Sequence, residues 1–366
     1  MPWPIARAAL EALPARTRSP VTISFSGGEP TLEWGTIERV VEHLDAQGRG
    51  ASPGGRAFAC HLTTNGLLID RERLAFLARH DFSVDLSLDG VEPAQDARGA
   101  GTFERLDELL RGWRAGHPDH FRRRCRVALT VSRTGAPVLA ESVRYLYGRG
   151  VPDILLQPAM GEAEWPAGEL ARLDGQLARV AEEAAQHRGA TGQIPVAALR
   201  GHARRGRARR RWGCSAPLGQ SLAVDVDGQV YPCVLAAPSY QRSEAREAAA
   251  PLACLALGDI RGGLGALRSA ATACAESGLF APKALQHSGH RACASCPHRA
   301  GCFVCPIGRT WGRSSSDRNA VPGFLCAFNG LLQGHGRRFR AAAGDEAANG
   351  SGRVLRWLFG RGRVTT

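Results

Sequence analysis

Short apolar runs alternate with amphipathic stretches over the first 165 residues. Five runs rich in apolar and β-branched residues are predicted strands, at 21–25, 57–63, 83–88, 125–131 and 153–157. Between them, apolar residues recur with helical spacing over 36–44, 71–79, 103–113 and 138–147. This alternation predicts parallel strands joined by crossover helices, in an open sheet or a barrel. The active site of such a fold lies at the carboxyl ends of the strands.

The pattern changes after residue 165. Residues 166–187 have the composition of one or two helices, and residues 200–211 hold seven arginines, typical of an exposed connector or of a docking patch for an acidic peptide. Over 212–329 the helical periodicity fades and Cys, Gly and Pro separate short segments, so metal sites would have to help hold this region together. A packing helix, rather than a membrane anchor, is expected over 354–359.

Length, composition and charge narrow the class of protein. The 366 residues favour two domains, and 44% hydrophobic with 22% charged residues is typical of a globular chain. With neither an 18-residue apolar run nor a secretory signal, we expect a cytoplasmic protein without a membrane partner. The formal net charge is +13, and Lys283 is the only lysine. Such near-exclusive use of arginine indicates GC-rich coding rather than nucleic-acid binding, whereas an acidic peptide would suit the charge.

Polar residues and glycines close three successive predicted strands. Residues 25–30 read Phe-Ser-Gly-Gly-Glu-Pro and lack the Gly-Lys-Ser/Thr ending of a phosphate loop; the Glu29 carboxylate suits an ammonium ligand. Thr64-Asn65-Gly66 closes the second strand and Ser87-Leu88-Asp89-Gly90 the third. Each alone is ordinary turn chemistry. Three in succession indicate a binding rim.

Cysteine usage indicates metal chemistry. Nine of the eleven cysteines lie between Cys214 and Cys326, in a chain expected to stay in a reducing compartment. Two Cys-x2-Cys pairs fall within thirteen residues, and these with their neighbours give seven candidate ligands: Cys214, Cys233, Cys293, Cys296, Cys302, Cys305 and Cys326. Zinc is the default for paired thiolates, but seven ligands imply two sites and make iron–sulfur clusters competitive. The other four, Cys60, Cys125, Cys254 and Cys274, are interpreted as structural, Cys254 being the best spare ligand.

Together, the strand-end motifs and the seven-cysteine pattern resemble radical S-adenosylmethionine (radical SAM) enzymes with a SPASM extension. The resemblance covers roughly residues 20–330. It implies an α/β fold: a partial (β/α)6 TIM-like barrel missing its first strand, followed by a Cys-rich SPASM domain. The implied divisions are a barrel at 1–165, a helical and Arg-rich linker at 166–212, the SPASM iron–sulfur domain at 213–330 and a basic C-terminal tail at 331–366.

The resemblance also implies roles for individual residues. S-adenosylmethionine would be bound by the Gly-Gly-Glu-Pro loop and by polar residues of later strand ends: Gly27, Gly28, Glu29, Pro30, Asn65, Ser87 and Gln157. One auxiliary 4Fe–4S cluster would be held by Cys293, Cys296, Cys302 and Cys326. The second would be held by Cys214, Cys233 and Cys305, with its fourth ligand unassigned.

Three departures from the family pattern matter. The family's Cys-x3-Cys-x2-Cys loop precedes the Gly-Gly-Glu-Pro motif, yet none of the 26 residues before Gly27 is cysteine. We favour a start codon assigned too far downstream over a relative that has lost the reaction, and a third 4Fe–4S cluster is expected only if that motif lies upstream. The Cys302–Cys305 spacer is one residue short, and no cysteine stands just before Cys214. In sulfatase-maturing relatives, an aspartate that acts as a base follows the cysteine equivalent to Cys233. Val234 stands at that position here, so sulfatase maturation is not expected.

Two main functions follow from this interpretation. The first is a maturase that modifies a peptide or protein through a 5′-deoxyadenosyl radical, with flavodoxin or ferredoxin as reductant; it is an enzyme if the missing cysteine motif exists upstream. The second is a non-catalytic iron–sulfur electron carrier or peptide-binding subunit that has lost the cofactor-cleaving cluster. A zinc-binding module on an α/β scaffold is a third, which sulfide analysis would distinguish from both.

Overall fold

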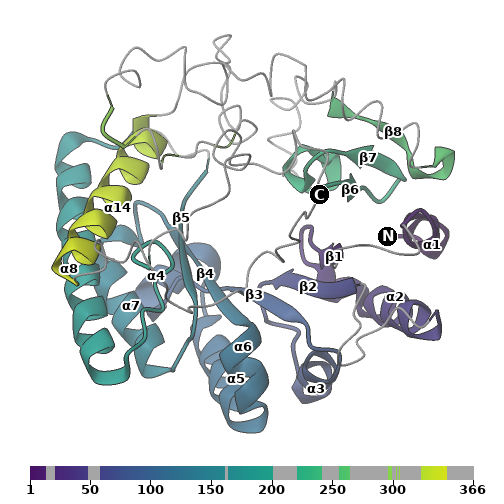
Figure 1. Ribbon diagram of the computed structural model, residues 1–366, viewed down its shortest axis with the longest axis horizontal. Coiled ribbons are helices and arrows are strands. Elements are labelled where there is room, and N and C mark those ends of the chain that lie inside the picture. The colour runs from purple at the N-terminus through teal and green to yellow at the C-terminus, as the bar shows by residue number, and fades with distance from the viewer. Residues whose placement is uncertain are drawn as a thin grey trace, which may run out of the picture.

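Five parallel strands form the central sheet of the protein (Figure 1). The computed structural model describes residues 1–13, 21–47, 58–160, 164–200, 221–240, 255–263, 296–298, 302, 305 and 323–343. Within these, the sheet has the order β1-β2-β3-β4-β5, so each strand pairs with the next one along the chain. The strands are β1 (Val21–Phe25), β2 (Phe58–Thr64), β3 (Ser83–Ser87), β4 (Cys125–Val131) and β5 (Ile154–Pro158). The predicted α/β fold with a parallel sheet is confirmed.

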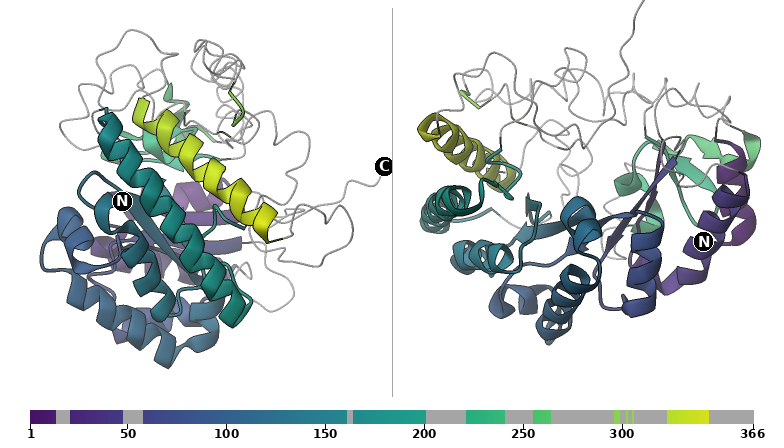
Figure 2. Two further views of the ribbon diagram at one scale, coloured as in Figure 1. Left: turned by 90° about the vertical axis from the view of Figure 1, so that its left-hand side faces the viewer. Right: turned by 60° about the horizontal axis from the view of Figure 1, so that its bottom comes forward.

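Helices cover the convex side of this curved sheet (Figure 1, Figure 2). Those near or between the strands are α2 (Trp34–Ala46), α3 (Arg71–Arg79), α4 (Glu92–Gly99), α5 (Phe103–Gly116), α6 (Pro118–Arg124) and α7 (Leu139–Gly148), with short 3-10 turns η1 (Pro30–Glu33) and η2 (Ala136–Val138). After β5, α8 (Ala167–Thr191) is one long helix. Beyond it, Val196 forms a parallel bridge with Ile154 and extends the sheet past β5. Among the described residues, helices that cover one face of a parallel sheet are what a partial TIM-like barrel requires.

Strand alternation separates an apolar face from a polar one. Val84 and Leu86 of β3, and Val127 and Leu129 of β4, are almost fully buried. They belong to the main hydrophobic core with Trp113 of α5. The residues between them in each strand are less buried and point to the opposite face. The core therefore lies between sheet and helices, and the concave face is left for polar side chains.

A second, small sheet is joined to the first by the N-terminal helix. The strands β6 (Ala223–Val224), β7 (Gln229–Tyr231) and β8 (Gly258–Asp259) pair antiparallel, with the turns η4 (Val234–Ala236), η5 (Pro238–Tyr240) and η7 (Ile260–Gly262) beside them. Helix α1 (Trp3–Glu11) inserts Ile5 into the core of this sheet and Leu10 into a cluster with α2. Figure 1 shows α1 between the two.

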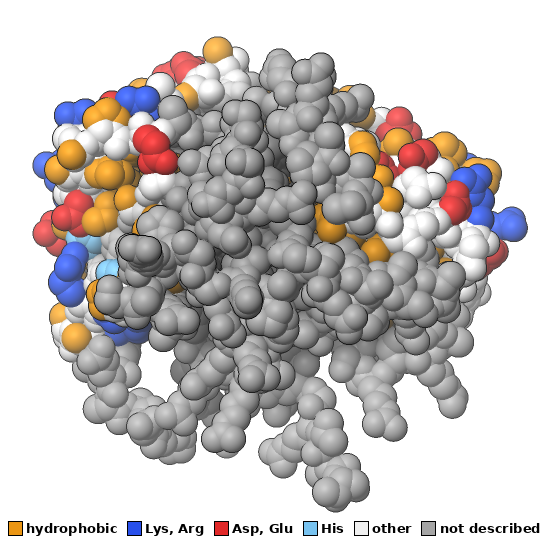
Figure 3. Space-filling view, turned by 90° about the horizontal axis from the view of Figure 1, so that it is seen from above, with side chains coloured by type: hydrophobic (Ala, Val, Ile, Leu, Met, Phe, Trp, Pro, Cys, Tyr) orange, Lys and Arg blue, Asp and Glu red, His pale blue; other side chains and the backbone are white. Residues whose placement is uncertain are grey.

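Helix α14 (Gly323–Ala342) packs along α8 at the other edge of the molecule (Figure 2). Phe324 stacks on Trp165 with ring centroids 4.2 Å apart, and His335 lies 2.7 Å from the Asp174 carboxylate. The division expected at residue 330 therefore falls inside a helix. Seen from above, the described side chains on both flanks mix hydrophobic, basic and acidic types (Figure 3). No helix among the described residues is long and apolar enough to cross a membrane.

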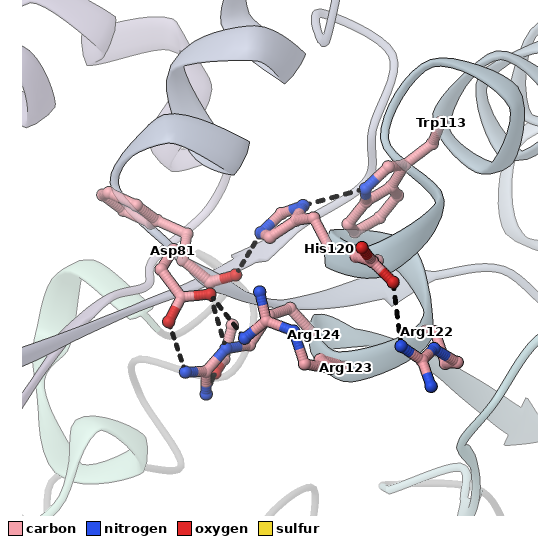
Figure 4. A network of polar contacts seen from close by, with 9 residues as sticks. Asp81, Trp113, His120, Arg122, Arg123 and Arg124 are labelled. Carbon is pink, nitrogen blue, oxygen red and sulfur yellow. Dashed lines mark hydrogen bonds and ion pairs between the residues drawn. The ribbon is translucent and has the colours of Figure 1, made fainter. Parts of the chain in front are cut away.

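The turn from α3 into β3 is held by a network of polar contacts (Figure 4). Asp81 has a φ of 53°, and the amide of Phe82 reaches back to the Leu77 carbonyl at 2.9 Å, closing the helix in a Schellman-type turn. The Asp81 carboxylate pairs with Arg124 at 2.5 Å and with Arg123 at 3.2 Å. An aspartate thus takes the place usually filled by glycine, and its ion pairs tie the end of α3 to the end of α6.

Candidate functional site

Glu29 joins the ends of the first two strands. Its Oε1 accepts hydrogen bonds from the Thr31 amide at 3.1 Å, from the Thr31 hydroxyl at 2.5 Å and from the Thr64 hydroxyl at 2.7 Å. Its Oε2 accepts one bond, from the Asn65 amide at 2.7 Å. All four donors are neutral, and no cation among the described residues pairs with this carboxylate. Because Oε2 retains acceptor capacity, the site suits an ammonium group.

The glycines around this rim are of two kinds. A Cβ on Gly66 (φ 78°) would overlap the Leu86 side chain, and one on Gly90 (φ 102°) would overlap Ser142. Packing and backbone conformation therefore both require glycine there. A Cβ on Gly28 would meet nothing within 4 Å in the described part of the chain. No described residue therefore blocks the approach of a ligand beside Gly28.

Asn65, Ser87 and Gln157 occupy three different strand ends. The Asn65 side-chain oxygen accepts a hydrogen bond from the Leu67 amide at 3.0 Å in a local turn. The side-chain nitrogen of Asn65 has no acceptor among the described residues. Ser87 is paired in register with Ala128, and Gln157 with Thr130. The register places Ser87 and Gln157 on the same concave face, one pleat apart in height. Gln157 is exposed.

Asp89 uses its carboxylate in a structural role. It accepts hydrogen bonds from Arg98 at 2.8 and 2.9 Å and from the Thr130 amide at 2.7 Å. Arg98 also donates to the Thr130 hydroxyl at 2.6 Å. The Asp89–Arg98 ion pair thus links the ends of β3 and β4. No sequence motif indicates Arg98, because it lies in a helix without apolar periodicity.

A ladder of charged residues crosses the concave face below the rim. His61 Nε2 lies 3.3 Å from Asp85, whose other oxygen lies 3.6 Å from Arg126. Arg126 donates to Asp153 at 2.8 Å, and Asp153 also pairs with Arg200. Burial alone would lower the pKa of Arg126, but the two carboxylates outweigh it and raise that pKa. The ladder could not be predicted from the sequence, because its members are far apart in the chain and meet only through strand register.

Four of the five described candidate ligands fall into two groups, and Cys296 is half-buried outside both. Cys233 and Cys305 pack against the core of the small sheet, beside Val230 and Tyr231. Cys302 packs against Leu325, the residue before Cys326 in α14. Cys214 and Cys293 lie outside the described residues, as do Cys254 and Cys274. No three His, Cys, Asp or Glu side chains within the described residues are grouped closely enough to hold a metal ion.

The burial of Cys125 agrees with its interpretation as a structural residue. It is 3% exposed within β4, and burial raises the pKa of its thiol. The neutral thiol is therefore a packing group. Cys60, in β2, packs at the margin of the same core.

Comparison with known proteins agrees with this geometry. The model of the Radical SAM superfamily matches residues 5–119, from α1 into α6. Residues 5–119 therefore match a radical SAM domain. The solved structure of native anSMEcpe with bound AdoMet and Cp18Cys peptide has a TM-score of 0.65, is 17% identical and covers 94% of this chain and 92% of that chain. A hexahistidine-tagged form of anSMEcpe with bound AdoMet has a TM-score of 0.66, also at 17% identity, and covers 94% of this chain and 87% of that chain. At this identity the likeness shows a shared fold.

Proposed function

We propose that this chain is a radical SAM iron–sulfur enzyme of the SPASM type that modifies a peptide or protein. The observation that carries the proposal is the Glu29 carboxylate, held at the strand rim by four neutral donors and paired with no cation among the described residues, inside the segment that matches the superfamily model. A positively charged ammonium group would complete its charge balance. The amino group of S-adenosylmethionine is such a ligand, and the structural neighbours bind AdoMet.

Other rim residues would hold the rest of the cofactor. Gly27, Gly28 and Pro30 would line the methionine end, since no described residue fills the space beside Gly28. The Asn65 side-chain amide, Ser87 and Gln157 lie at the ends of β2, β3 and β5 and could donate hydrogen bonds to the nucleoside. When bound with an iron–sulfur cluster, S-adenosylmethionine supplies radical chemistry that removes hydrogen from an unactivated carbon. The rim would orient the cofactor over the concave face of the sheet.

The two groups of cysteines support two auxiliary 4Fe–4S clusters. Cys233 and Cys305 share one apolar environment, as the set Cys214, Cys233 and Cys305 requires. Cys302 lies against the start of α14 near Cys326, as the set Cys293, Cys296, Cys302 and Cys326 requires. Thiolates are the ligands that iron–sulfur clusters prefer. These clusters would accept or relay the electron left after hydrogen abstraction.

A peptide or protein is the proposed substrate. The neighbouring structures contain bound Cp18Cys and Kp18Cys peptides. The net charge of +13 favours an acidic peptide, and the arginines at 200–211 offer a contact for it, although all of that segment beyond Arg200 lies outside the described residues. Flavodoxin or ferredoxin is the expected reductant, and the reaction is expected in the cytoplasm.

Cofactor cleavage tests the proposal directly. The chain, extended to any in-frame Cys-x3-Cys-x2-Cys encoded upstream of Met1, is purified without oxygen and analysed for iron and sulfide. With dithionite it should convert S-adenosylmethionine to 5′-deoxyadenosine. Zinc without sulfide would identify the zinc module instead, and full cluster loading without cofactor cleavage would contradict catalysis.

Glu29→Gln should weaken S-adenosylmethionine binding by about tenfold or more, because it removes the negative charge opposite the ammonium group. Glu33→Gln is the matched control, because Glu33 is exposed in the adjoining turn. Equilibrium dialysis measures both variants, and equal affinities would contradict the assignment.

A non-catalytic iron–sulfur carrier or peptide-binding subunit is the second candidate. It expects auxiliary clusters, peptide binding and no 5′-deoxyadenosine. A stop codon upstream of Met1 before any cysteine motif would favour it over the enzyme.

A further inference from the structure

Three arginines line a cavity where helices α5 and α7 end. Its volume is about 340 Å³, and Arg111, Arg114, Ala115, Gly148 and Arg149 line it. We name it the arginine cavity. It lies beside the segment that leads into β5, where the sheet strands begin, and so at the opposite end of the sheet from Glu29. It is therefore separate from the rim.

One carboxylate organises two of these arginines. Asp107 accepts hydrogen bonds from Arg111 Nε at 3.0 Å, from the Tyr145 hydroxyl at 2.6 Å and from Arg149. Burial alone would raise the pKa of Asp107, but these hydrogen bonds outweigh it and lower that pKa. The carboxylate therefore stays charged. Arg111 uses only Nε in this contact, and its Nη groups have no acceptor in the part of the chain that the structure describes.

Arg114 is held without an ion pair. It makes no hydrogen bond or salt bridge with any described residue; instead its guanidinium group lies over Gly150. A Cβ on Gly150 would be 2.8 Å from Nη1 and 2.9 Å from Cζ, and the φ of 74° also favours glycine. The backbone at Gly150 thus leaves room for the guanidinium group at the cavity wall.

The charges at this cavity do not balance. Three guanidinium groups face one carboxylate, a difference of 3 − 1 = two positive charges among the lining residues and their ion-pair partner. The ends of α5 and α7 favour cations through the helix dipole, which accounts for arginine at these positions. Helix dipoles nevertheless supply no hydrogen-bond acceptor for the guanidinium N–H groups of Arg111 and Arg114 that have none among the described residues. An open hollow of this size admits a small ligand.

We propose that the arginine cavity binds a small anion that carries phosphate. Guanidinium groups match phosphate oxygens with pairs of hydrogen bonds, and a phosphate dianion would balance the two excess charges. The phosphate could be inorganic or part of a small organic molecule. The proposal needs no iron–sulfur cluster and stands independently of the proposed function.

Isothermal titration of the full chain with inorganic pyrophosphate, at low ionic strength, tests the site. Binding of one pyrophosphate per chain is expected. Low ionic strength is chosen because salt then screens the attraction between the arginines and the anion least. Arg114→Gln should raise the Kd by about tenfold or more, since a charge-assisted contact is lost. Arg179→Gln is the matched control. It removes the same charge from an exposed position of α8 and should change the Kd by less than about twofold.

Parallel titrations identify the source of the phosphate. Tighter binding of adenosine diphosphate than of pyrophosphate, again lost in Arg114→Gln, would indicate an organic phosphate; the reverse order would indicate an inorganic one. Lack of pyrophosphate binding by the wild type, or equal weakening in both variants, would overturn the proposal. Binding of a hexaglutamate peptide without binding of pyrophosphate would also overturn it, in favour of an acidic protein partner.

Discussion

Two carboxylates at the strand rim differ in their hydrogen-bond partners: one pairs with an arginine, and the other is bound by neutral groups. Asp89 is 6% exposed and fully engaged by Arg98 and the Thr130 amide. Glu29 is half-buried and meets only neutral donors among the described residues. Hydrogen bonding to neutral groups fixes a carboxylate in place without cancelling its charge. Geometry and charge therefore assign Asp89 to the scaffold and support the proposed role of Glu29 toward a ligand, a distinction that the residue types alone do not give.

His120 predicts a dependence of stability on pH. The Trp113 indole donates to its Nδ1 at 3.0 Å, and its Nε2 donates to the Phe82 carbonyl at 2.9 Å (Figure 4). Both ring nitrogens are thus satisfied in the neutral form. A proton on Nδ1 would oppose the indole N–H. Burial, partly offset by the Phe82 carbonyl and Asp81, lowers the pKa of His120 to about 4.

Because the folded-state pKa lies below the ordinary value of 6.5, the unfolded chain takes up a proton first as the pH falls. The stability that His120 contributes is present above pH 6.5 and is lost progressively toward pH 4. One such proton gives a slope of at most about 1.4 kcal/mol per pH unit. Urea unfolding between about pH 4 and 7 measures it, and His120→Gln should flatten the decline. An unchanged slope in that variant would contradict the assignment.

At the scale of elements, periodicity predicted the sheet well. All five expected strands were found within one residue at each end, because alternating or continuous apolar runs mark strands that pack under helices. Among the described helices, four were not expected: α1, α4, α6 and α14. Helix α4 is Glu-Pro-Ala-Gln-Asp-Ala-Arg-Gly and α6 has one large apolar residue, so neither shows an apolar face. Their stability comes from tertiary contacts that a sequence pattern does not carry.

The site was predictable in part. Glycine and carboxylate types at strand ends indicated the rim, since such residues close strands at ligand-binding edges. The partners that define each role were not predictable. Thr64 and Asn65 bind Glu29 across 35 and 36 residues, and His61 meets Asp85 only through the register of β2 and β3. Contacts of that kind depend on the fold rather than on local spacing.

Helix α14 predicts a link between packing and cluster occupancy. Phe324 is 2% exposed and stacks on Trp165. It lies two residues before Cys326 in the chain. Phe324→Ala should lower the free energy of unfolding by about 3–5 kcal/mol. If Cys326 is a cluster ligand, the variant should also lose iron. Phe324→Tyr keeps the stacked ring and should retain more of both. Loss of stability with full iron content would separate α14 from the cluster.

At the scale of the whole molecule, α1 makes one unit of two sheets. Its residues face two hydrophobic clusters: Ile5 packs with Val230 and Leu255 of the small sheet region, whereas Ala6 and Leu10 pack with α2. The small sheet has only three short strands and a limited core within the described residues. A sheet of that size gains stability by packing on a neighbour. Residues at the very start of the chain thus help position segments more than 200 positions away.

This arrangement predicts a separable effect of two core residues on one helix. Ile5→Ala removes the contact with the small sheet, and Leu10→Ala is the matched control that removes the contact with α2. Ile5→Ala should speed hydrogen exchange of the β7 amides selectively, since local opening there then costs less free energy. Leu10→Ala should instead speed exchange in α2. Equal acceleration at β7 in both variants would mean that α1 acts as one rigid support rather than as two independent contacts.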